Sequence, residues 1–352
     1  MSTRTLFAAI ALLGIAAGAR ADIMVGSYGS SVSSEPLRVF ADMANGDAEP
    51  LRVLSGPATG MTSPVGGVFD PIEGVVYVAD FWGQAIRVYP AYGAGDIAPL
   101  RTLATPFLGQ VRMLAIDAAH DELLTIGSGC CLLAFARTAS GAAAPLRSVS
   151  WGGSAGSVTQ LNYPSAIVYM PPSDEVVLVD SDATAPYAPK LLVFNRTDSG
   201  NTAPKRVIRG ALTGFGSWVA GIAHDVPSRQ LYVVAYTENE DFTRSARVLV
   251  FDDQADGNAM PLRTISGPST GLEMPADASP AGLAIDPVRR RLVVSIGHYT
   301  LDSGNRLLVF DLDASGNAAP LQRVEGPQTT FGGQIATPIW LPTDPITRNG
   351  FE

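Results

Sequence analysis

The feature that most constrains this chain is a set of three residues that recurs at fixed spacing. An aromatic residue is followed six positions later by a glycine and ten positions later by a proline, as in LVFDLDASGNAAP at 308–320. The pattern occurs six times, with its aromatic residue at Phe40, Tyr89, Phe135, Phe194, Phe251 and Phe310. Such self-similarity indicates a protein built from six stacked structural repeats.

Each repeat contains the pattern of four short strands. In the unit 279–326, apolar runs at 280–286, 291–296, 306–310 and 321–326 are separated by turn residues. Four short strands per unit of 46 to 59 residues are typical of one blade of a β-propeller. The same reading fits four further units, at 64–105, 113–151, 164–210 and 218–267.

The sixth blade is expected to combine both ends of the chain. The segment 22–56 offers only three strands, and 337–342 (TPIWLP) offers a single one. Pairing TPIWLP with DIMVGS at 22–27 would close the ring and remove free sheet edges. The sequence therefore predicts an all-β, six-bladed propeller of four-stranded antiparallel blades over 22–343, followed by a tail at 344–352.

The first 21 residues have the pattern of a cleavable signal peptide. Arg4 is followed by an apolar stretch and by Ala19-Arg20-Ala21, an A-x-A cleavage site. We expect cleavage after Ala21, a secreted or periplasmic mature protein and no membrane span in it. The alternative is an uncleaved membrane anchor.

The sequence contains only two cysteines, the adjacent Cys130 and Cys131. In an oxidising compartment they can pair with each other or with another chain. A vicinal bridge would be strained because adjacent Cα atoms are only about 3.8 Å apart. The alternative is two reduced, partly buried residues at the start of a strand.

Charge and loop lengths indicate where ligands are expected. The net charge of −9 argues against nucleic acid as a partner, because an acidic surface repels phosphate. Loop length varies only between the second and third strands of a blade and between successive blades. These loops open onto one face, and variable loops on a rigid scaffold commonly carry function.

Acidic and aromatic residues gather on this variable face. The acidic candidates are Asp80, Asp180, Asp182 and Glu238, and the other candidates are Trp82, Trp218, His298 and Tyr299. Clustered carboxylates suit calcium, although a solvated acidic rim without a metal fits the same pattern. The aromatic residues suit a carbohydrate or peptide, or they fill gaps between blades.

The segment GVFDPIEGVVYVADFWGQAIRVY at 67–89 resembles the blade of NHL-repeat propellers. Asp80 and Asp180 stand where that family has an aspartate at a strand end. The Asn-Arg pair that the family often has before its third strand is complete only at Asn305-Arg306. Because NHL propellers are mostly binding platforms, the resemblance implies a scaffold rather than an enzyme.

Two functions remain open from the sequence. The first is a non-catalytic propeller that binds a protein, peptide or glycan and needs no cofactor. The second is a calcium-dependent hydrolase, lactonase or lyase with its site in the central channel. The residues expected where first strands enter the channel are not acidic, and they include Arg112-Met113, Ser165 and Ser217-Trp218. This disfavours the enzyme, and no nucleophile-elbow, HExxH or P-loop motif is present.

Overall fold

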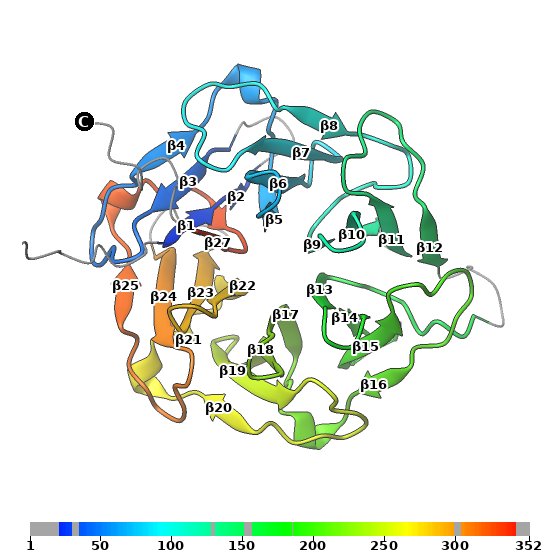
Figure 1. The fold of residues 1–352 in the computed structure, drawn as a ribbon. Coiled ribbons are helices and arrows are strands. Elements are labelled where there is room, and N and C mark those ends of the chain that lie inside the picture. The colour runs from blue at the N-terminus through cyan, green and yellow to red at the C-terminus, as the bar shows by residue number, and fades with distance from the viewer. Residues whose placement is uncertain are drawn as a thin grey trace, which may run out of the picture.

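The computed structural model describes residues 21–29, 35–127, 131–150, 157–184, 186–298 and 304–342. These residues form six antiparallel blades arranged in a ring around a central opening (Figure 1). The six-bladed β-propeller predicted from the repeat is confirmed.

Each blade runs from an innermost strand at the channel to an outermost strand at the rim. The innermost strands are β27 (Ile339–Pro342), β5 (Pro64–Asp70), β9 (Leu114–Asp117), β13 (Ala166–Met170), β17 (Trp218–Asp225) and β22 (Ala278–Asp286). The second strands are β1 (Ala21–Val25), β6 (Val75–Asp80), β10 (Glu122–Gly127), β14 (Glu175–Ser181), β18 (Gln230–Glu238) and β23 (Arg291–His298).

In each blade the outermost strand is shorter than the third strand. The third strands are β3 (Leu37–Phe40), β7 (Ala85–Pro90), β11 (Cys131–Ala136), β15 (Pro189–Asn195), β19 (Arg244–Asp252) and β24 (Arg306–Asp311). The outermost strands are β4 (Arg52–Leu54), β8 (Arg101–Leu103), β12 (Arg147–Ser150), β16 (Arg206–Ile208), β20 (Arg263–Ile265) and β25 (Gln322–Val324).

Short elements occur in the loops of the variable face. The two-residue strands are β2 (Ser27–Tyr28), β21 (Glu273–Met274) and β26 (Gln334–Ile335), with β2 paired to β26 and β21 to β19. Four single-turn 3₁₀ helices follow outermost strands: η1 (Pro57–Thr59), η2 (Ala211–Thr213), η3 (Pro268–Thr270) and η4 (Pro327–Thr329). None of the described helices is long and apolar enough to cross a membrane.

The two ends of the chain close the ring as expected. β27 pairs antiparallel with β1, with Asp22 opposite Leu341 and Met24 opposite Ile339. The blue and red strands of this blade lie side by side in Figure 1. β1 begins at Ala21, one residue before the expected start of the mature chain.

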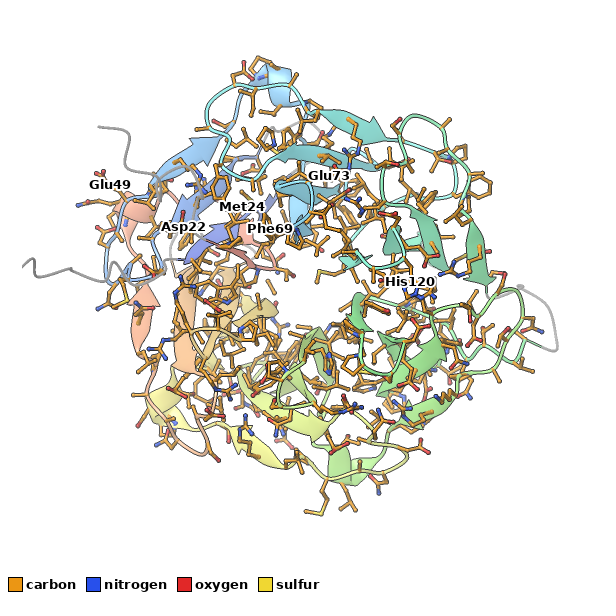
Figure 2. The ribbon with its side chains drawn as sticks, in the orientation of Figure 1. Asp22, Met24, Glu49, Phe69, Glu73 and His120 are labelled. Carbon is orange, nitrogen blue, oxygen red and sulfur yellow. The ribbon has the colours of Figure 1, made fainter. Side chains whose placement is uncertain are left out.

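Both faces of a blade are covered by neighbouring blades, which explains why second strands such as β6 and β14 are buried along their whole length. All six residues of β6, VVYVAD, are buried, as are all seven of β14, EVVLVDS. Side chains fill the spaces between blades and leave the middle of the ring open (Figure 2). Each repeat therefore packs on its neighbours, as stacked repeats do.

The repeated glycine links neighbouring blades, a role that the sequence did not reveal. Its backbone joins each blade to the outermost strand of the preceding blade, through N–H···O bonds of 2.7–3.0 Å that occur at all six junctions. The six residues have φ between +61° and +73°, the left-handed region that glycine adopts without strain. They are Gly46, Gly95, Gly141, Gly200, Gly257 and Gly316.

Replacing one of these glycines by alanine tests this conformational requirement. An added Cβ at Gly257 would meet no atom within 4 Å, so only the backbone geometry opposes it. We expect Gly257→Ala to lower the free energy of unfolding by about 1–2 kcal/mol, as measured by urea denaturation. Gly257→Asn, which tolerates this region better, should cost less. An alanine variant as stable as the asparagine variant would contradict the argument.

The side chain at the start of each outermost strand also links neighbouring blades. In every blade it donates a hydrogen bond of 2.9–3.5 Å to a backbone carbonyl of the next blade. The donors are Arg52, Arg101, Arg147, Arg206, Arg263 and Gln322. This regular contact shows that the repeated arginine is structural.

The one exception in this set, Gln322, has an electrostatic explanation. In two blades the arginine also pairs with the first residue of the second strand, Arg147 with Glu122 and Arg206 with Glu175. In the last blade that first residue is Arg291. A guanidinium at position 322 would place two positive charges together, whereas a glutamine still donates to the next blade.

Candidate functional site

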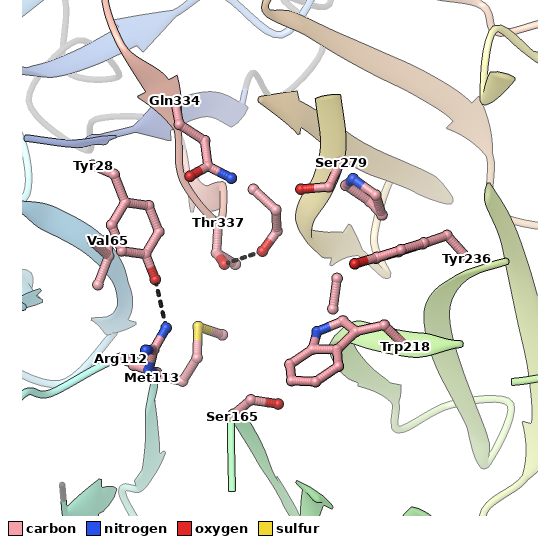
Figure 3. A pocket seen from close by; sticks show the side chains of 13 residues that line it. Tyr28, Val65, Arg112, Met113, Ser165, Trp218, Tyr236, Ser279, Gln334 and Thr337 are labelled. Carbon is pink, nitrogen blue, oxygen red and sulfur yellow. Dashed lines mark hydrogen bonds between the residues drawn. The ribbon is translucent and has the colours of Figure 1, made fainter. Parts of the chain in front are cut away.

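The channel opens on the variable face into a cavity of about 390 Å³. The cavity is formed where innermost strands begin: Val65 belongs to β5, Met113 immediately precedes β9, and Trp218 begins β17. Figure 3 shows Tyr28 and Arg112 on one side of the hollow and Trp218 and Tyr236 across from them. We call this the mouth cavity.

A second cavity, also of about 390 Å³, adjoins the mouth cavity. We call it the side cavity, and it shares Arg112, Ser165 and Trp218 with the mouth cavity. Its outer wall carries Tyr163 and Tyr187, whose rings lie 6.4 Å apart in an edge-to-face arrangement. The two hollows therefore form one elongated site with a shared central part.

Arg112 is the charged residue in the described lining of both cavities. Its guanidinium lies 4.7 Å from the ring centre of Phe81 and donates a hydrogen bond of 3.0 Å to the hydroxyl of Tyr28. The Phe81 ring in turn packs against Tyr28 at 5.6 Å and Trp82 at 5.0 Å. This aromatic support holds the cation at the edge of the channel.

Uncharged polar groups complete the wall. Ser165, Gln334 and Thr337 line the mouth cavity, and Gln110 lines the side cavity. Thr337 donates to the carbonyl of Ala281 at 3.1 Å. The described lining contains no carboxylate, so the oxygen ligands that calcium prefers are not provided by these residues.

Asp80 and Asp180 are buried at strand ends and do not line either cavity. Asp80 is fully buried, accepts hydrogen bonds from the backbone N–H groups of Thr62 and Ser63, and pairs with Arg87 at 2.8 Å. Asp180 accepts from the backbone of Asn162 and Tyr163. Its burial raises the pKa of its carboxyl. Both aspartates hold inter-blade loops in place.

The two other acidic candidates form ion pairs at the surface. Asp182 pairs with Lys190 at 3.2 Å and with Arg209 at 2.8 Å. Glu238 pairs with Arg244 at 2.9 Å. Together with Asp80 and Asp180, these residues do not converge on one point of the described channel lining. Asp180 and Asp182 meet at Lys190, which lies 3.8 Å from Asp180 and 3.2 Å from Asp182. None of the four acids is in the described lining of either cavity, where Trp218 is the one sequence-predicted candidate.

Of the remaining candidates, Trp218 is central to the site and Trp82 supports it from behind Phe81. His298 is 5% exposed and lies 3.8 Å from Asp277, away from both cavities. Tyr299 lies outside the described residues. Cys131 is not a free thiol, but Cys130 lies outside the described residues, so the vicinal bridge stays a prediction.

One group of metal-type ligands occurs among the described residues, at turns on the face opposite the cavities. It consists of Asp117, His120 and Asp174, with ligand atoms within 4.8 Å of one another. The guanidinium of Arg196 already lies 3.1 Å from Asp117 and 2.6 Å from Asp174. Its positive charge satisfies these carboxylates and opposes a second cation.

Sequence reasoning missed the importance of Arg112 and of Tyr163. The sequence places Arg112 at a channel entrance, but there it served only as evidence against a calcium site, because it is not an acid. Its position next to Phe81 and Tyr28 depends on segments far apart in the sequence. The sequence feature that could have indicated Arg112 as a ligand-binding residue is its position, as a cation directly before an expected innermost strand.

Comparison with a solved structure supports the fold. A chain from the crystal structure of a nidogen/laminin complex matches with a TM-score of 0.56 and 14% identity, covering 91% of this chain and 98% of that one. Hydrazine synthase of Kuenenia stuttgartiensis matches with a TM-score of 0.45 and 12% identity, over 70% of this chain and 62% of that one. No family model matches, and neither does any curated protein sequence. The NHL-type assignment therefore stays a prediction, and what the likeness to the nidogen/laminin chain establishes is a β-propeller fold.

Proposed function

We propose that this chain is a secreted, non-catalytic binding protein whose ligand occupies the mouth cavity and side cavity. The observation that carries the proposal is the composition of their lining, which combines exposed aromatic rings, hydroxyl and amide groups and a single arginine. Concave sites of about 300–1,000 Å³ with a few polar groups are typical of small-ligand binding. The signal-peptide pattern supports secretion, and the NHL-like blade pattern supports a scaffold role.

The test is a binding screen with glycan and peptide arrays. We expect the full chain to retain ligands that Trp218→Ala loses, because Trp218 belongs to both cavities. Phe107→Ala is the matched control, since Phe107 is 53% exposed in an inter-blade loop and lines neither cavity. Binding that survives Trp218→Ala unchanged would place the site elsewhere.

The calcium-dependent hydrolase is tested by removing metal. Because the described lining offers no carboxylate, we expect purified protein to contain no stoichiometric calcium and to keep the same Tm after EDTA treatment. Elemental analysis and thermal melting give both values. A stoichiometric calcium whose removal lowers the Tm would instead establish a metal site and justify a screen of lactone and ester substrates.

A further inference from the structure

Arg112 stands apart from the other cationic side chains of this protein. It is exposed, yet no carboxylate of the described residues lies within 4.0 Å of it, whereas each of the other exposed arginines and lysines in the described ranges has such a partner. Three more arginines lack an acidic partner: Arg38, Arg247 and Arg306. These three are buried or half-buried and bind neutral oxygens.

An exposed cation without an acidic partner stands out in this sequence, because acidic residues outnumber arginine and lysine, 33 to 24. One of the guanidinium N–H groups of Arg112 is used by Tyr28, and its face is held against Phe81. Its remaining N–H groups have no hydrogen-bond partner among the described residues, and Arg112 lines both cavities where they join. An arginine fork of this kind matches the two oxygens of a carboxylate.

The charge of the ligand is limited by the same geometry. Arg112 is the one cation in the described lining, and the protein as a whole is negative. A nucleotide or a polyanion would bring several negative charges to a site that neutralises one. The site therefore fits a ligand with a single carboxylate.

The remaining lining matches a sugar. Trp218, Tyr163 and Tyr187 are 36%, 52% and 49% exposed, so they offer ring surface to a ligand. The C–H faces of a pyranose carry a slight positive charge and stack on the negative face of such rings. The side chains of Ser165, Gln110 and Gln334 have no hydrogen-bond partner among the described residues, and sugar hydroxyls would supply one.

We propose that the site binds an oligosaccharide that carries one uronic acid, with the carboxylate on Arg112 and a neutral sugar ring in the adjoining cavity. The two connected cavities give room for neighbouring rings, and Trp218 contacts both. This inference rests on the proposed binding function. A peptide with a carboxylate is the competing ligand, and it is an outcome of the test.

The experiment uses isothermal titration calorimetry with a panel of disaccharides in which a uronic acid is linked to a neutral hexose. Each is compared with its methyl ester, with the neutral disaccharide of the same linkage and with a diuronate. We expect at least one uronate disaccharide to bind, and its ester and neutral analogue to bind about tenfold or more weakly. The diuronate should also bind more weakly.

Two variants test the roles given to Arg112 and Trp218. Arg112→Met should abolish the preference for the acid over its ester, and Trp218→Ala should weaken binding of both forms. Arg323→Met is the control, because Arg323 is an exposed arginine that pairs with Glu325 at 2.7 Å outside both cavities. Unchanged melting temperatures confirm that the variants are folded.

The outcomes separate this inference from the proposed function. If acid and neutral sugars bind equally, or if only carboxylated peptides bind and Trp218→Ala abolishes this, the uronate assignment is wrong and the binding function stands. If Arg112→Met keeps the acid preference, the assignment is also wrong. If neither array nor panel shows binding that depends on Trp218, both proposals fail.

Discussion

A chain that ends at Thr337, and so lacks β27, is expected to lose most of its stability. Its blade would keep three strands, and the inner edge of β1 would be unpaired. Ile339 and Leu341 are 6% and 0% exposed, and burying such side chains contributes about 1.5–3 kcal/mol each. Because whole domains are stable by only about 5–15 kcal/mol, this loss should unfold or aggregate a large fraction of the protein.

The control is a chain that ends at Thr343 and keeps β27 complete. Circular dichroism melting and gel filtration should show it to be monodisperse and far more stable than the shorter chain. Leu341→Ala in the full chain is a milder variant and should cost about 2–5 kcal/mol. Equal melting temperatures for the two truncated chains would contradict closure of the ring by β27.

Replacing Arg206 by methionine is expected to be strongly destabilising, because Arg206 bonds to the next blade and also pairs with a buried acid of its own blade. Both terminal nitrogens of Arg206 bond to Glu175 at 2.8 Å, and the Glu175 side chain is fully buried. The substitution leaves a buried carboxylate with Lys205 as its remaining ion-pair partner. Removing one partner of a buried pair costs about 3–5 kcal/mol.

The matched control removes both charges. Glu175→Leu combined with Arg206→Met leaves no buried charge and should recover most of the stability lost in Arg206→Met. Gln322→Ala, at the equivalent position without a buried acid, should cost only about 1 kcal/mol. Urea denaturation of the three variants gives the comparison. A double variant as unstable as Arg206→Met would show that the charge is not the cause.

The same pair gives a pH dependence. Burial of Glu175 disfavours its charged form, but hydrogen bonds from Arg206 and Lys205 outweigh this and lower its pKa to about 2 from the usual 4.5. The folded state thus holds Glu175 ionised where the unfolded state takes up a proton. This stabilisation is complete above about pH 4.5 and is lost as the pH falls toward 2. The double variant should lack this part of the acid-induced loss.

The fold could be predicted from the sequence because the residue pattern that specifies a blade is repeated along the chain. Six copies of the aromatic, glycine and proline pattern determined the blade count, and the incomplete first unit predicted pairing between β27 and β1. The roles of the repeated glycine and arginine across the blade junctions were not predicted. They depend on which residues of the next blade come close, and repeat spacing alone does not give that information.

The candidate binding site could be predicted from the sequence only in part. The variable face and Trp218 were identified from loop lengths and composition. Asp80 and Asp180 were expected on that face as acids, but their positions at strand ends let them accept backbone N–H groups of the neighbouring loops. A sequence does not distinguish such a buried acceptor from a solvated acid. Arg112 differs from other arginines only by its lack of an acidic partner, which is a property of the folded chain.

The most direct test is a crystal structure of the protein soaked with the uronate disaccharide panel. The account predicts density for a sugar ring against Trp218, with its carboxylate in contact with Arg112. Density on the opposite face near Asp117, or empty cavities at concentrations where calorimetry shows binding, would contradict it.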